Sequence, residues 1–130
     1  MSIEDVRNAI AAAVETTGLK TTPYLTDSVN TPQAAVGGPD ITYHGSFDGE
    51  ATYMFVVRVY MVRDVVFAQK YSDELSEPTG ATSIVYALEN DSSLRALVYS
   101  VTVSRRTPVD GTAVAEAVYL TVDFEVTVVF

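Results

Sequence analysis

The sequence predicts an α+β domain in which helices pack on one face of a mainly antiparallel sheet. Residues 118–130 alternate apolar and polar side chains, which is the pattern of a strand with one buried face. Two Asp-Gly pairs, at 48–49 and 110–111, are typical of tight hairpin turns and favour antiparallel pairing. Apolar residues recur at three- and four-residue spacing elsewhere, which indicates an N-terminal helix and a central helix pair.

The last strand has the most regular pattern in the chain. Every even position from 118 to 130 is apolar, whereas the odd positions from 119 to 127 are polar or amphipathic. Because successive side chains of a strand point to opposite faces, this run presents one continuous apolar face. It is longer than an ordinary strand, so we expect it to bend or to carry a bulge.

The helices are predicted from their end signals and their apolar stripes. Ser2 stands at an N-cap position, Asp5 completes a capping box, and Gly18 follows as a C-terminal cap. Asp64 is expected to cap a second helix, which Pro78-Thr79-Gly80 ends. The residues expected to face inward are Ile3, Val6, Ile10, Ala13, Val14 and Thr17, then Phe67, Ala68, Tyr71 and Leu75, and in a third helix Ala81, Ile84, Val85 and Leu88.

The remaining strands are predicted from shorter runs. Residues 52–62 are apolar on both faces apart from Arg58, so we expect them at the centre of the sheet and covered on each side. A short edge strand is predicted at 19–22, and another strand at 41–44, after Gly37-Gly38-Pro39 breaks the apolar run before it. Residues 97–105 are predicted as a strand with Tyr99, Val101 and Val103 on one face.

The composition fits a single domain spanning 1–130. The hydrophobic fraction is 48% and the mean hydropathy +0.18, which is enough for a proper core at this length. The absence of cysteine excludes disulfides, thiolate nucleophiles and cysteine-based zinc sites. Eight basic and seventeen acidic residues give a net charge of −9, which argues against a protein that grips nucleic acid by its phosphates.

The chain carries no membrane signal. No apolar run reaches the length that a bilayer-spanning helix needs. The first residues lack the basic start and the apolar centre of a signal peptide. We therefore expect the protein to be made in a cytoplasm and to have no membrane partner.

No catalytic, cofactor-binding or metal site is predicted, and an enzyme is not expected. His44, the only histidine, stands near Ser46 and Asp48, but a catalytic triad is defined by a geometry that local sequence does not supply. The acidic residues within 73–77 have no histidine beside them and are typical of a solvated helix face. Neither of the usual glycine-rich phosphate-binding patterns is present.

Several short strings accompany this order of elements. The first helix ends in Gly-Leu and leads into Pro-Tyr-Leu-Thr-Asp-Ser-Val-Asn-Thr-Pro and Ala-Ala-Val-Gly-Gly-Pro. A hairpin leads to Thr-Tyr-Met-Phe-Val-Val-Arg-Val-Tyr-Met-Val-Arg, then the helical Ala-Gln-Lys-Tyr-Ser-Asp-Glu-Leu, Glu-Pro-Thr-Gly, a short helix and two closing strands. Over essentially its full length the chain resembles the tail terminator proteins of long-tailed bacteriophages, particularly the small ones of phages that infect actinobacteria.

This resemblance implies a structural virion protein. Such proteins form a ring, usually six-fold, that caps the end of the tail tube and joins it to the head connector or stopper protein. The partners expected from it are further copies of the chain, the tail tube protein and the connector. DNA would pass through the ring lumen without specific binding, which the acidic balance suits.

The hairpin tips are the candidate subunit contacts. Phe47 and Val109 are apolar residues beside the two Asp-Gly pairs, where water is expected, so one tip at least is predicted to bury itself in the next subunit. Two other interpretations stay open: another neck or head-tail connector protein, and a cytosolic ligand-binding or hydrolytic α+β domain. The predicted interface residues are Phe47, Asp48, Gly49, Val109, Asp110 and Gly111.

Overall fold

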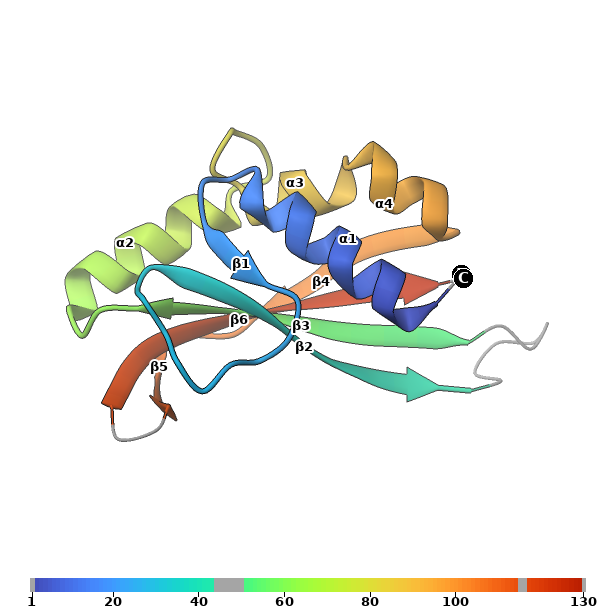
Figure 1. Ribbon diagram of the computed structural model, residues 1–130. Coiled ribbons are helices and arrows are strands. Elements are labelled where there is room, and N and C mark those ends of the chain that lie inside the picture. The colour runs from blue at the N-terminus through green and yellow to red at the C-terminus, as the bar shows by residue number, and fades with distance from the viewer. Residues whose placement is uncertain (1, 44–50, 115–116, 130) are drawn as a thin grey trace.

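The computed structural model describes residues 2–43, 51–114 and 117–129, and they form one sheet with helices packed against it (Figure 1). The helices are α1 (Ile3–Glu15), α2 (Val65–Ser76), α3 (Ile84–Glu89) and α4 (Ser92–Leu97). The strands are β1 (Lys20–Thr22), β2 (Gln33–Thr42), β3 (Thr52–Met61), β4 (Ser100–Arg106), β5 (Asp110–Val114) and β6 (Ala117–Val129).

The sheet has six strands, most of them antiparallel. Its order is β1-β2-β3-β6-β4, and β5 also pairs with β6. In this sheet only β1 and β2 pair in parallel, whereas the pairs β2–β3, β3–β6, β4–β6 and β5–β6 are antiparallel. The α+β class and the mainly antiparallel pairing are therefore confirmed, as is the central place of β3. The short strand predicted near residue 20 is β1, at the edge of the sheet.

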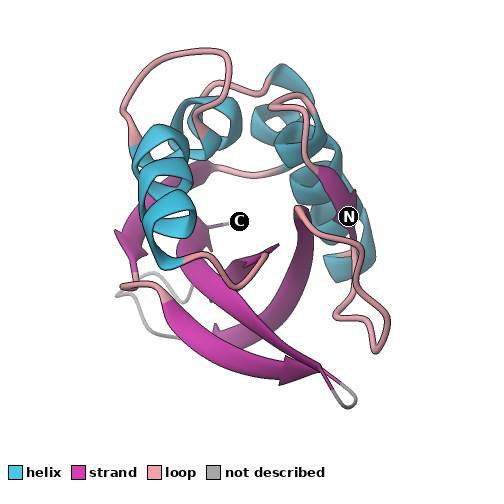
Figure 2. Ribbon diagram, turned by 90° about the vertical axis from the view of Figure 1, so that its left-hand side faces the viewer, coloured by secondary structure: helices cyan, strands magenta, loops and turns pink. Residues whose placement is uncertain are grey.

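The core lies against one face of β6 and β3. Val122, Phe124, Val126 and Val128 are fully buried, while the residues between them are partly exposed, as the alternating pattern predicts. Figures 1 and 2 show the helices above the sheet. Buried helix residues pack on this face of the sheet: Val6, Ile10, Val14, Ala68, Leu75, Ile84, Leu88 and Leu94.

The other face of β3 differs from the prediction that both faces are covered. Met54, Val56 and Arg58 remain partly exposed. Their neighbours across the ladder are Thr127, Glu125 and Asp123, so the apolar side chains of this face lie beside polar ones. Because the polar side chains of β6 need water or charged partners, an apolar layer does not cover this part of the face.

The Asp110-Gly111 pair does not form a turn, contrary to the sequence prediction. Both residues lie in β5 and pair with Thr121 and Leu120 of β6. β4 and β5 both pair with the side of β6 that faces away from β3, one after the other along its length. Pairing with β6 satisfies the backbone hydrogen-bonding groups of β5, and this outweighs the local turn preference of Asp-Gly.

The first hairpin is only partly within the described residues. β2 and β3 pair antiparallel from Gln33 and Tyr60 to Thr42 and Thr52, but Asp48-Gly49 lies outside the described part. Gly37-Gly38-Pro39 does not end the strand, since β2 continues through it with a register shift. Gly38 makes this possible: its φ is 87°, and a Cβ there would approach the Met54 carbonyl oxygen to 3.0 Å.

The helix caps agree with the sequence, but one helix was missed. Ser2 and Asp5 form the capping box of α1, and Asp64 caps α2. The carboxylate of Asp91 accepts a hydrogen bond from Leu94 N at 2.8 Å and begins α4, where the sequence had suggested a break followed by a strand from 97. α4 has a single buried residue, Leu94, and its short length hides any periodicity.

Candidate interaction surfaces

Four exposed apolar residues gather where β3 passes into α2. Val62, Val65, Val66 and Phe67 are between 47 and 61% exposed, and we call them the junction patch. The ring of Phe67 stacks on Tyr71, with the ring centroids 5.8 Å apart. Clustered apolar side chains of this kind on a protein surface mark sites of contact with other molecules.

A tight turn holds the junction patch in place. Asp64 N donates to Val62 O at 2.8 Å, and the Asp64 carboxylate accepts from Phe67 N at 3.0 Å. These two bonds fix the direction in which the first turn of α2 leaves the sheet. The backbone that carries the patch is therefore held by hydrogen bonds at the start of α2.

The sequence placed Phe67 inward, and the structure shows it exposed. The buried residues of α2 are Ala68, Ser72 and Leu75. Ser72 is buried because its hydroxyl donates to Ala68 O at 2.6 Å, so its polar group is satisfied within the helix. Ala68 and Leu75 are buried as predicted, and Ser72 is buried in addition. Tyr71 is half-buried, and burial, followed by the charge of Glu74, raises the pKa of its phenol.

The predicted interface residues near 110 have different environments. The side chain of Val109 packs against the core and is not at a loop tip. Asp110 and Gly111 are exposed on β5. Beyond them, Val118 is 44% exposed on β6. Of the six predicted interface residues, the structure thus places the three near 110. Phe47, Asp48 and Gly49 lie outside the described residues.

A second group of exposed side chains lies at the opposite end of the sheet. Tyr43 is 66% exposed and Tyr99 83% exposed. Tyr43 follows Thr42 and Tyr99 precedes Ser100, and these two neighbours lie in one row across the sheet with Thr52 and Val129. The junction patch, by contrast, follows the Met61 end of β3. The two ends of the sheet therefore carry two separate groups of exposed apolar and aromatic residues, which we call the junction patch and the tyrosine end (Tyr43 and Tyr99).

Charged pairs occupy the polar face of the sheet. Arg58 donates two hydrogen bonds to Asp123, at 2.9 and 3.1 Å, and both side chains are partly buried. The hydrogen bond to Asp123 raises the pKa of the Arg58 guanidinium, although its burial acts in the opposite direction. Arg105 pairs with Glu125 on the same face at 3.4 Å. A cavity of about 280 Å³ beside Arg58 is lined by Thr107, Pro108, Val109, Asp110, Thr112, Thr121 and Asp123.

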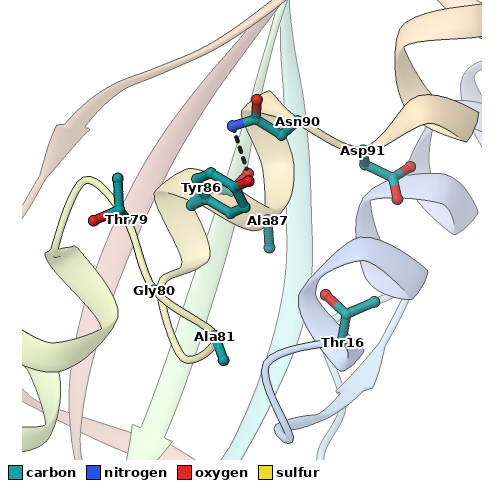
Figure 3. Close-up of a pocket in the computed structure, with 8 residues that line it drawn as sticks. All are labelled: Thr16, Thr79, Gly80, Ala81, Tyr86, Ala87, Asn90 and Asp91. Carbon is teal, nitrogen blue, oxygen red and sulfur yellow. Dashed lines mark hydrogen bonds between the residues drawn. The ribbon is translucent and has the colours of Figure 1, made fainter.

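A larger cavity, of about 670 Å³, lies between the end of α1 and the loop before α3 (Figure 3). Its polar groups are largely engaged with the backbone. The Thr16 hydroxyl donates to Ala13 O at 2.6 Å, Asn90 Nδ2 donates to Tyr86 O at 3.1 Å, and the Asp91 carboxylate caps α4. The cavity therefore offers a ligand mainly the ring of Tyr86 and small side chains.

The described residues are 2–43, 51–114 and 117–129. Within these ranges no group of three or more His, Asp and Glu side chains could hold a metal ion. Asp73 of the acidic helix face pairs with Arg106 at 3.3 Å. His44, Ser46 and Asp48 lie outside these ranges.

Comparison with known proteins adds no family assignment. No protein-family model matches the chain, and no curated protein sequence matches it. Among the described residues, no helix is both long enough and apolar enough to cross a membrane.

Proposed function

We propose that this chain is a structural virion protein that caps the end of a phage tail tube as a ring and joins the tail to the head connector. The junction patch is the observation that supports this most directly, because it presents four apolar side chains that a lone subunit leaves in water. The resemblance of the element order and short strings to tail terminator proteins supplies the identity of the ring.

The two ends of the sheet fit a head-to-tail contact. A ring needs two different surfaces on each subunit, one for each neighbour, with a rotation that closes. The junction patch supplies an aliphatic and aromatic surface at one end, and the tyrosine end supplies two exposed rings at the other. Tyrosine is enriched in protein interfaces because its ring is apolar and its hydroxyl tolerates water. In the proposed ring, the junction patch of one subunit contacts the tyrosine end of the next.

The charge of the chain supports passage of DNA through such a ring. The net charge is −9, and Arg58 and Arg105 are each paired with a carboxylate, Asp123 and Glu125 respectively. An acidic lumen repels phosphates and gives DNA no specific hold. We therefore expect the ring to guide DNA without binding it.

A null mutant of the phage that encodes the chain tests this function. Loss of the protein should leave filled heads and unattached tails as separate particles, because each half assembles on its own. The tails should be irregular or overlong, since tube subunits can still add to the open end. Electron micrographs of the lysate distinguish the outcomes: normal tails attached to heads would refute the proposal, and unfilled heads alone would indicate an earlier connector protein.

Purified protein provides the complementary test. Added to tails from the null mutant, it should bind one end of each tube as a ring, and those tails should then join filled heads. Binding along the whole tube, or at neither end, would contradict the role. Tails from a phage that retains the protein serve as the control, because their ends are already capped.

A further inference from the structure

We propose that charged side chains close the free edges of the sheet, so that copies of this chain cannot associate by adding strand to strand. An edge strand exposes backbone N–H and C=O groups that can pair with another chain. In the described part of this sheet, β1, β2, β4 and β5 each border an edge, and each has a charged side chain bonded to its backbone. This inference concerns how copies associate and does not depend on the proposed function.

At the β1 edge, the charged side chain comes from the last residue of α1. The Glu15 carboxylate accepts a hydrogen bond from the backbone N–H of Thr21, at 3.3 Å. Since β1 is the first strand in the sheet order, this N–H belongs to the outermost strand on that side. A negative side chain thus occupies a position that the carbonyl of an added strand would take.

The edge of β2 is closed by a cation from the same helix. β1 pairs with only three residues of β2, from Gln33 to Ala35, and leaves the next part of β2 at the edge. There Arg7 Nη1 donates to Val36 O at 2.8 Å, and Nη2 donates to Gly38 O. The guanidinium bonds also to Pro23 O, at 3.1 Å, just after β1 ends. The Arg7 guanidinium therefore bonds the edge carbonyls of β2, as the Glu15 carboxylate bonds the edge N–H of β1.

The opposite edge is closed by two carboxylates. β4 is the last strand in the sheet order, and its Val103 N–H donates to the Glu89 carboxylate of α3 at 3.0 Å. On β5, the Gly111 N–H donates to the carboxylate of Asp110 at 2.7 Å. The sign of each charge matches the backbone group that it meets: carboxylates bond N–H groups and the guanidinium bonds carbonyls. Such charge-assisted bonds are stronger than those between neutral groups.

A closed edge has a physical consequence for association. A second strand would have to break these charge-assisted bonds, and at β2 it would displace Arg7, which is only 7% exposed, from its carbonyl partners, which is costly. Copies of the chain are therefore restricted to contacts through side-chain surfaces such as the junction patch. This restriction prevents open-ended stacking of sheets, which a protein with long edge strands otherwise risks.

Glu89→Ala tests the inference at the β4 edge. The substitution frees the Val103 N–H but leaves the buried core unchanged. Sedimentation velocity over a concentration series should show self-association strengthened by about tenfold or more relative to the unmodified protein. Glu74→Ala is the matched control, because Glu74 is exposed on α2 and the change in net charge is the same. Glu89→Gln keeps an acceptor oxygen and should lie between the two.

Hydrogen exchange locates the new contact. On association of Glu89→Ala, amide exchange should slow within β4 and remain unchanged in β3, which is already paired on both sides. The same slowing of exchange in β4 is expected when Val66→Lys is also present. The double variant thereby distinguishes association through the β4 edge from association through the junction patch. Two outcomes would overturn the inference. In one, folded Glu89→Ala protein self-associates no more than the Glu74→Ala control, and in the other it self-associates without protection of the β4 amides. If Glu89→Ala does not fold, Glu15→Ala decides the question at the β1 edge by the same measurements.

Discussion

Arg7 shows at the residue scale how one side chain connects distant parts of the chain. It is only 7% exposed, and its guanidinium bonds the carbonyls of Pro23, Val36 and Gly38. The ring of Tyr24 lies 4.6 Å from the guanidinium carbon, which adds a cation–π contact. The positive charge is thus satisfied by backbone dipoles and an aromatic face. Arg7 fixes both the loop after β1 and the irregular part of β2.

Substitution of Arg7 by Met should destabilise the protein. Met keeps much of the apolar volume but leaves three carbonyls without their donor, so the free energy of unfolding should fall by about 2–4 kcal/mol. Denaturant melts measure the loss. Arg95→Met, on the exposed face of α4, is the control and should change stability by less than about 0.5 kcal/mol. Equal losses in the two variants would show that the carbonyl contacts of Arg7 contribute nothing specific.

β6 is the element that joins the rest of the sheet. It pairs with β3 along one side and with β4 and β5 along the other. The sequence predicts a bend or a bulge in this long strand, and Figure 1 shows β6 as a curved ribbon, whereas the register shift lies in its partner, between Val103 and Arg105 of β4. Because β6 buries its even residues from Val122 to Val128 and leaves the odd residues between them partly exposed, the two faces of this part of the strand should respond differently to substitution.

Phe124→Ala tests the two faces of β6. Phe124 is fully buried, so truncation should cost about 3–5 kcal/mol by loss of burial and by the cavity left behind. Thr127→Ala, on the partly exposed face of the same strand, should cost less than about 1 kcal/mol. Thr127 is a better control than Asp123, because Asp123 is paired with Arg58. Similar shifts of the denaturation midpoint in both variants would contradict the one-sided burial of β6.

At the scale of the whole molecule, the junction patch and the tyrosine end lie at opposite ends of the sheet, and charged side chains bond to the backbone of the edge strands between them. The junction patch follows the last residue of β3, whereas the tyrosine end borders the row through Thr52 and Val129. This arrangement favours association end to end over association edge to edge. A ring formed in this way would repeat one contact at every subunit boundary.

Val66→Lys should prevent ring formation and leave the subunit folded. Val66 is 61% exposed, so the free energy of unfolding should change by no more than about 0.5 kcal/mol. Placed in the proposed contact, the lysine would have to lose its water against apolar side chains, and rings on tail tubes should be absent in electron micrographs. Ala12→Lys, at an exposed position of α1, adds the same charge and should leave assembly intact. Normal rings with Val66→Lys would exclude the junction patch as the subunit contact.

The sequence by itself determined the features that depend on neighbouring residues. The alternation in β6, the caps Ser2 and Asp64, and the apolar run of β3 are local signals, and each led to the correct element. The α+β class followed from them because helices and antiparallel strands were both recognisable. The role as a tail terminator remains a prediction, since it depends on a resemblance and on contacts with other molecules.

Only the tertiary structure decided the features that depend on distant residues. The turn preference of Asp110-Gly111 was overridden by the ladder with β6. In α2, Ser72 is buried and the predicted Phe67 is exposed. Arg7 meets carbonyls 16 to 31 positions away, and Glu89 meets an N–H 14 positions away. No pattern within a short window marks such residues, because their partners come together only after the sheet and helices have packed. The junction patch became visible for the same reason: exposure is a property of the packed chain.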